Sequence, residues 1–419
     1  MGNALLITTT FFCFIMKQFL KGFSWILFSI VCLAYATTEL YVFKPTKLFS
    51  GQKLYNPYSM GISDLRRSNF HAHSKTWGGL TNGADRIDSI VGCYIRTGYD
   101  VVGLSDYHKI NSDEKNEENI FIPIYEHGIN LQKSHYLAIN AKRVSFFDVL
   151  LFHSNHTRQF LINHLSGFSD IVCVAHPGIR DGHSPTSLQL LSNYSHLELI
   201  NGSKVARVHW DSALSAGRPV WALSNDDIHQ LQEKKFAKSW TAVLASEKTP
   251  EAIIDALKVG SSFAVLENDR IEKGEINLIP IPTEFSIDKS ELHIKFQEPV
   301  ESISLIGQSG KVKLRLRGEK EVFYVIQDED TYIRAEFKNS GAEVFSNPIF
   351  RWNQMSDLSN YSLLNVNIWG TFCFRISIFL IWFFLTVIFY PKVIPVIFIT
   401  WSKIQKIFTH GIFELNVVK

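Results

Sequence analysis

The sequence has few cysteines and almost no excess of charge, and each shortage excludes a class of protein. A formal net charge of +2 over 419 residues gives no argument for a nucleic-acid partner. Three of the five cysteines, Cys13, Cys32 and Cys373, lie in the apolar ends. Only Cys93 and Cys173 remain, which is too few for a disulfide framework. We expect them to be buried free thiols, although one disulfide between them stays open.

Long apolar runs are confined to the two ends of the chain. The run 369–390 contains a single charge, Arg375, and is long enough to span a bilayer, which takes roughly 20 apolar residues. The shorter run 22–38 follows Lys17 and Lys21, so the segment 1–43 is expected to be an export signal, either cleaved or kept as a membrane anchor. Lys392, Lys403 and Lys406 follow the second run and favour a cytoplasmic tail over 391–419. The middle of the chain would then lie outside the cytoplasm, in the periplasm or on the cell surface.

Strand and helix patterns alternate between residues 66 and 275. Helical spacing is present at 87–95, 158–165, 188–191, 208–215 and 250–259, and short apolar strand patterns lie between these segments. Such alternation predicts an α/β fold with a parallel sheet, and the number of units favours a barrel. After about residue 275 the pattern changes to short alternating strands with glycines between them. We expect a small β-sandwich over 276–351.

Histidines are concentrated in the predicted barrel, where 13 of the 15 lie between His71 and His229. Residues two apart in a strand point to the same face, so His71 and His73 can present two imidazoles to one metal ion. Asp227 and His229 repeat this spacing near the end of the region. Imidazole and carboxylate together are preferred by divalent transition metals. The pattern therefore predicts a metal-dependent hydrolase.

The order of these motifs resembles the PHP (polymerase and histidinol phosphatase) superfamily. The residues that carry the resemblance are Asn69–Ser74, Val101–His108, Ile122–Gly128, His135–Leu137, Ala175–Pro177, Glu198–Gly202 and Gly217–His229. Within the superfamily the chain is similar to an exported or membrane-attached branch that includes carbamate-ester hydrolases. The resemblance implies a distorted (β/α)7 barrel that holds two or three divalent metal ions (Mn, Fe or Zn). The implied ligands are His71, His73, Glu126, His135, His176, Asp227 and His229, with Glu126 bridging two ions.

Two positions depart from the family pattern. The second motif of the family has Asp followed directly by His, whereas here Tyr107 separates Asp106 from His108, so that either residue can fill the position. We favour His108 as the ligand and keep Asp106 as a catalytic candidate. Gly78 stands where the family often has an acidic residue or histidine, which puts the third metal ion in doubt.

The expected function is a phosphoesterase that uses a metal-bridged hydroxide to attack a small phosphorylated substrate. His176 or His229 would protonate the leaving group, and Arg180 and His183 would hold the phosphate. A carboxyl- or carbamate-ester hydrolase on the same site stays open. So does a catalytically inert, membrane-tethered binding protein.

Overall fold

The computed structural model describes residues 2–62, 64–112, 118–268, 279–352 and 364–390, and shows a mixed α/β protein. The chain divides into two compact units. One consists of Met1–Leu40 and Val366–Lys419, and the other of Tyr41–Asn365.

The described part of the first unit is dominated by two long helices, α1 (Gly2–Thr37) and α7 (Ile368–Phe389). By length and composition alone, Met16–Thr37 and α7 are long and apolar enough to cross a membrane. The two helices are joined by hydrogen bonds, because Trp382 Nε1 donates to Ser29 Oγ and Arg375 Nε donates to the carbonyl of Ala36. The predicted cytoplasmic tail, 391–419, lies outside the described residues.

Two sets of strands in the second unit position the site. The first set pairs in the order β11–β10–β2–β3 and consists of β2 (Leu65–Asn69), β3 (Val101–Val102), β10 (Ser239–Leu244) and β11 (Ser262–Glu267). The second set pairs in the order β4–β5–β6–β7–β8, with β9 also on β7. Its strands are β4 (Ile124–His127), β5 (Tyr136–Ala141), β6 (Ser169–Val174), β7 (His196–Asn201), β8 (Lys204–Val205) and β9 (Trp221–Asn225).

The strand ladders of the described residues do not close into the predicted (β/α)7 barrel. The two sets are joined only by single parallel bridges, Tyr107 to Glu126 and Ala72 to Ile228. The sheet is also not parallel throughout, because β5 runs antiparallel to both β4 and β6. The connection 128–135 between β4 and β5 is shorter than the dozen or more residues that a parallel crossover requires, which explains the reversal.

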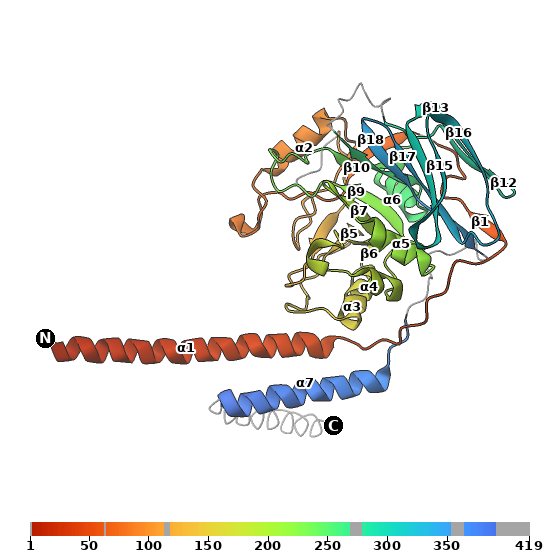
Figure 1. Cartoon of the computed structure of the whole chain (residues 1–419). Helices are drawn as coiled ribbons and strands as arrows, with labels where there is room; N and C mark the ends of the chain where they lie inside the picture. The colour runs from red at the N-terminus through yellow and green to blue at the C-terminus, as the bar shows by residue number, and fades with distance from the viewer. Residues whose placement is uncertain (1, 63, 113–117, 269–278, 353–363, 391–419) are drawn as a thin grey trace, which may run out of the picture. The chain divides into compact units, whose positions relative to one another are not determined.

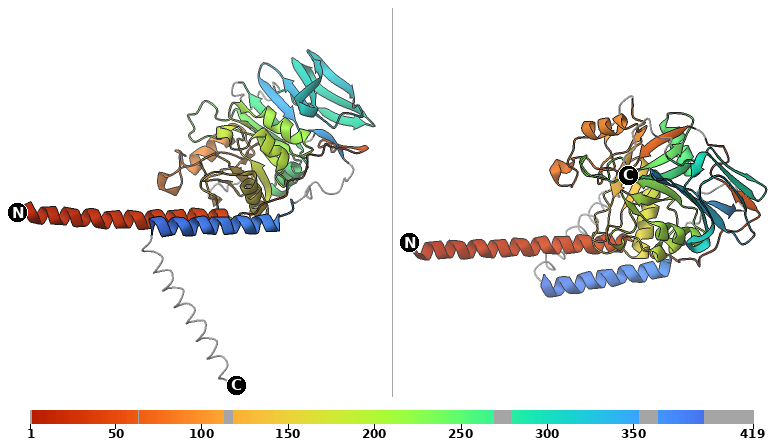
Figure 2. Two further views of the ribbon diagram at one scale, coloured as in Figure 1. Left: turned by 60° about the horizontal axis from the view of Figure 1, so that its bottom comes forward. Right: turned by 45° about the horizontal axis from the view of Figure 1, so that its top comes forward.

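The predicted helices are confirmed. Their bounds are α2 (Ile87–Arg96), α3 (Asn155–Ser166), α4 (Pro185–Leu190), α5 (Arg207–Ser215) and α6 (Pro250–Lys258). α3, α4 and α5 pack on one side of the second sheet and α6 on the other, whereas α2 packs against β3 of the first set (Figures 1 and 2). Alternate residues of β5 face different cores, as a strand requires. Tyr136 shares a core with α3, α4 and α5, whereas Leu137 shares one with α6 and with β3, β4, β9 and β10. The two sets of strands therefore enclose a common core.

The remaining strands form two facing layers, as the alternating pattern after residue 275 predicts. One layer is β12 (Glu284–Asp288), β13 (Glu291–Val300) and β16 (Glu319–Val325). The other contains β14 (Ser302–Gly307), β15 (Lys311–Leu316), β17 (Tyr332–Lys338), β18 (Ala342–Ser346), β19 (Ile349–Trp352) and β1 (Lys53–Tyr55). Leu292 and Val322 of the first layer share a core with Leu305 and Phe337 of the second. Because β18 pairs with β11, the first set of strands and this second layer belong to one continuous sheet. The boundary at residue 275 stays a prediction.

Candidate metal centre

Seven histidine and carboxylate side chains meet at one end of the strands of the second unit. They follow β2, β6 and β9, lie within β4, or precede β5. Because β5 runs antiparallel to its neighbours, its amino end lies beside the carboxyl end of β6. The residues fall into four overlapping sets whose ligand atoms lie within 4.8 Å of one another: His71, His73 and Glu126; His71, His176 and Asp227; His73, Asp227 and His229; Glu126, His135 and His176.

Four buried atoms at the centre of this cluster face one another without a hydrogen-bond partner among the described residues. They are His71 Nε2, His73 Nε2, Glu126 Oε2 and Asp227 Oδ1. Each nitrogen lies 3.1–3.4 Å from both oxygens. Buried carboxylates and the lone pair of a neutral imidazole are stable together only when positive charge is shared between them. The donor set therefore fits a divalent cation.

Glu126 presents its two oxygens to different histidines. Oε2 faces His71 and His73, whereas Oε1 lies 2.5 Å from His135 Nδ1 and 3.0 Å from His176 Nε2. Its side chain is fully buried. A carboxylate in this position can contribute one oxygen to each of two neighbouring ions.

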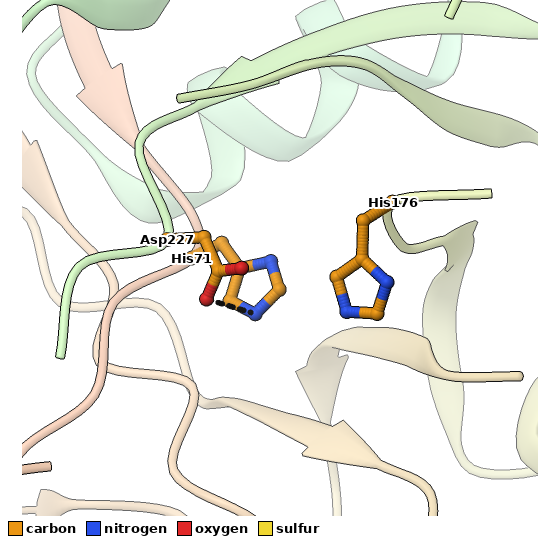
Figure 3. A group of neighbouring side chains, drawn as sticks. All are labelled: His71, His176 and Asp227. Atoms are coloured by element: carbon orange, nitrogen blue, oxygen red, sulfur yellow. Dashed lines mark ion pairs between the residues drawn. The ribbon is translucent and has the colours of Figure 1, made fainter. Parts of the chain in front are cut away.

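His176 and Asp227 enter the cluster from the ends of different strands (Figure 3). Both have a positive φ, 26° for His176 and 50° for Asp227, which is uncommon for residues other than glycine. Backbone strain of this kind concentrates at functional sites. In the figure, Asp227 and the ring of His71 lie together, and the ring of His176 faces them.

Glu198, at the middle of β7, fixes two of these residues from behind. Its Oε1 lies 3.0 Å from His71 Nδ1, and its Oε2 accepts from the backbone nitrogen of His176 at 2.7 Å. Asn201 and Asn225 donate to the same carboxylate. Metal-binding histidines usually donate their second ring nitrogen to such a carboxylate, which sets the tautomer. Nε2 of His71 is then the atom left to bind the cation.

The charges in the cluster favour cations strongly. Burial opposes protonation of His71 and His73, but the surrounding carboxylates outweigh it and raise the pKa of His73 to about 9 and that of His71 well above its usual value. Burial alone would raise the pKa of Glu126 and Asp227, yet the histidines hold both well below the usual range. Both carboxylates are therefore ionised at neutral pH. The site attracts either protons or a metal ion.

The other predicted site residues lie around the cluster rather than in it. His108 belongs to none of the four sets, because its Nδ1 contacts the carbonyl of Ser145 at 2.7 Å. Asp106 accepts hydrogen bonds from Ser74 and Asn111, and its Oδ1 lies 3.8 Å from His73 Nδ1. Arg180 is exposed on the 3-10 turn η3 (Ile179–Asp181). His183 is fully buried, with Nε2 3.0 Å from Ser134 Oγ.

Two residues at the cluster were not among the predicted site residues. The sequence contains one indication of Glu198, because it belongs to a segment that carries the family resemblance. A carboxylate inside an apolar strand does not, however, show which residue it contacts. Tyr107 stacks on His73 with ring centroids 4.8 Å apart and contacts His135 edge-on at 5.6 Å. Tyr107, which separates Asp106 from His108 in the sequence, therefore covers the cluster.

No family model matches the chain, and no curated protein matches it. Among solved structures, the chain is similar to a crystal structure described as a two-domain protein containing a predicted PHP-like metal-dependent phosphoesterase from Bacteroides vulgatus ATCC 8482. The two are 13% identical with a TM-score of 0.39, and the match covers 74% of this chain and 92% of that one. The assignment of the metal centre rests on its own geometry, and membership of the PHP superfamily stays a prediction.

Proposed function

We propose that this chain is a metal-dependent hydrolase and that its substrate is a phosphate ester. The observation that carries the proposal is the convergence of four buried atoms without hydrogen-bond partners, from His71, His73, Glu126 and Asp227. A purely structural cluster would supply such atoms with hydrogen bonds, because burying a polar group without one is costly.

The arrangement suits two ions on either side of Glu126. His71, His73 and Asp227 would hold one, and His135 and His176 would hold the other with Glu126, so that His229 would not be committed as a ligand. Divalent ions bound there would supply Lewis acidity, which lowers the pKa of water and stabilises an oxygen that gains charge. Sites with two ions recur in enzymes that cleave phosphate esters.

Hydrolysis forms one bond from the water oxygen to phosphorus and breaks the bond from phosphorus to the alcohol oxygen. The alcohol oxygen must gain a proton as it leaves. His229 is suited to this role, because its side chain is 23% exposed, the most of the four histidines grouped with Asp227. Tyr107 keeps its proton, since burial raises its pKa, and its hydroxyl can donate to a substrate oxygen.

A carboxyl- or carbamate-ester hydrolase is the second candidate, because Arg180, the arginine expected to hold the phosphate, is exposed. An inert binding protein is the third. A metal analysis of the purified full chain, followed by matched alkyl phosphate and alkyl carboxylate substrates with and without a chelator, separates the three. We expect bound Mn, Fe or Zn and chelator-sensitive release of phosphate. Release of carboxylate alone would select the second candidate, and metal without turnover the third.

We also propose that the terminal helices hold the chain in a membrane, with residues 41–365 outside the cytoplasm. Their length and low polarity support this. A reporter that is active only outside the cytoplasm should be inactive when fused after Lys419. Activity of that fusion would reverse the orientation.

A further inference from the structure

A cleft opens directly beside the candidate metal centre, and the surface that lines it is mainly apolar. Its volume is about 690 Å³, within the range of small-molecule sites. The apolar lining consists of Trp77, Leu80, Ile129, Leu131, Phe146 and Leu150. Five of these six have 45–91% of their surface exposed, although burial in a core would be the usual fate of such residues.

The cleft and the metal centre share two residues. His135, which contacts Glu126, and Tyr107, which stacks on His73, both line the cleft. A molecule in the cleft would therefore extend to the metal ligands without crossing a barrier of other side chains. This continuity identifies the occupant as a part of the substrate rather than as a separate partner.

The apolar wall is held in place by aromatic contacts. Phe146 stacks on His108 with centroids 5.9 Å apart and meets Trp77 edge-on at 6.2 Å. Trp77 Nε1 in turn donates to the carbonyl of Tyr107 at 2.8 Å. His108, which the sequence suggests as a ligand, therefore supports this wall. An exposed apolar surface with a fixed shape is typical of a binding site.

Lys133 is the one formally charged side chain among the residues that line the cleft. Its ammonium lies 5.7 Å from the centre of the Tyr107 ring, which stacks on His73 of the metal centre. A molecule with an anionic head and an apolar tail matches this distribution, because the head would lie by Lys133 and the metal ligands and the tail along Leu131 and Phe146.

We propose that the substrate is an amphiphilic ester, whose apolar group of several carbon atoms binds in the cleft between Trp77, Leu131 and Phe146 while the ester lies at the metal centre. This inference rests on the proposed function and specifies its substrate class. The apolar group adds binding energy through burial, so cleavage should become more efficient as the group lengthens.

The test compares methyl, butyl and octyl phosphate as substrates for the full chain in lipid nanodiscs, which avoids detergent in the cleft. Each additional methylene that is buried in the cleft strengthens binding. For partial burial in an open cleft we expect kcat/KM to rise at least ~10-fold from butyl to octyl phosphate. Leu131→Asn and Phe146→Asn should each remove most of this rise. The matched control is Phe323→Asn, since Phe323 is 57% exposed on β16, outside the cleft, and should retain the full rise.

A binding measurement separates failure of this inference from failure of the proposed function. Calorimetry with octylphosphonate and methylphosphonate, which are not hydrolysed, reports the cleft alone. If no ester is cleaved but octylphosphonate binds at least ~10-fold more tightly, the cleft assignment stands and the hydrolase proposal fails. Equal kcat/KM for butyl and octyl phosphate, or equal loss in Phe323→Asn and Phe146→Asn, would overturn the cleft assignment while leaving the hydrolase intact.

Discussion

Two buried charged clusters of the second unit differ in how their charges are satisfied. Arg334 on β17 is 1% exposed and donates two hydrogen bonds to Asp211 of α5, at 2.7 and 2.8 Å, and one to Glu336 at 2.7 Å. In the metal centre, buried carboxylates and imidazoles leave four atoms without a hydrogen-bond partner among the described residues. The first cluster is complete in the protein alone, and it joins α5 to β17. The second could be completed by protons or by metal ions, so the comparison sets a structural cluster beside a candidate binding site.

The largest effect is expected from a substitution at the candidate metal centre. Asp227→Ala removes a ligand from two of the four sets, and we expect loss of bound metal together with a fall in kcat of roughly 10³-fold, because an ion contributes several kcal/mol to the transition state. Metal content and turnover are measured on the same sample. Full metal retention in this variant would contradict the ligand assignment.

A substitution in the Arg334 cluster should have the opposite effect: it should lower stability and leave the metal content unchanged. Arg334→Met removes the ion-pair partner of Asp211 and one of the two arginines that contact Glu336, which keeps Arg207, and should lower the free energy of unfolding by about 3 kcal/mol. Denaturant unfolding measures the loss, and metal content at low temperature should not change. Loss of metal without loss of stability would show that the two clusters do not differ in the way described.

A smaller effect is expected at Glu198, which contacts the predicted ligands but belongs to none of their four sets. Glu198→Gln weakens the contact with His71 Nδ1 but keeps a side chain of the same shape, so metal affinity should fall by about 10- to 100-fold without loss of the fold. Competition with a chelator measures the affinity. Asn193→Ala is the matched control, since Asn193 donates to Asn163 and Ser166, away from the cluster, and should retain the original affinity.

The smallest effect concerns pH in the metal-free chain. The folded-state pKa of His73 is raised to about 9 from an ordinary value of 6.5. Its protonation therefore contributes stability that is fully present below pH 6.5 and is lost as the pH rises to about 9. Metal affinity should rise over the same interval, because binding displaces that proton. Thermal unfolding at pH 6 and pH 9 checks this, and a metal-free chain that is more stable at pH 9 would count against it.

The seven residues that the sequence suggests as ligands lie together in the structure, because histidines and carboxylates at strand ends meet wherever the strands share an edge. Their role as metal ligands stays a prediction. It does not predict the direction of β5, since Tyr136–Ala141 has the same alternating pattern whichever way the strand runs. His135 nevertheless lies with the other predicted ligands. Antiparallel pairing brings the amino end of β5 to the edge of the sheet where the carboxyl ends of its neighbours lie. The role of Glu198 and the contact between Phe146 and His108 could not be predicted. Both depend on contacts between distant segments, which the periodicity of the sequence does not encode.

The bridge between Ala72 and Ile228 has a consequence for the identity of the site. His73 donates its backbone nitrogen to Ile228, and Asp227 donates to His71, so the two ligand-bearing segments are fixed in one register. A slip of one residue would turn Phe70, Ala72 and Ser74 toward the cluster and both imidazoles away from it. Two backbone hydrogen bonds thus determine whether imidazoles or the side chains of Phe70, Ala72 and Ser74 face the cluster.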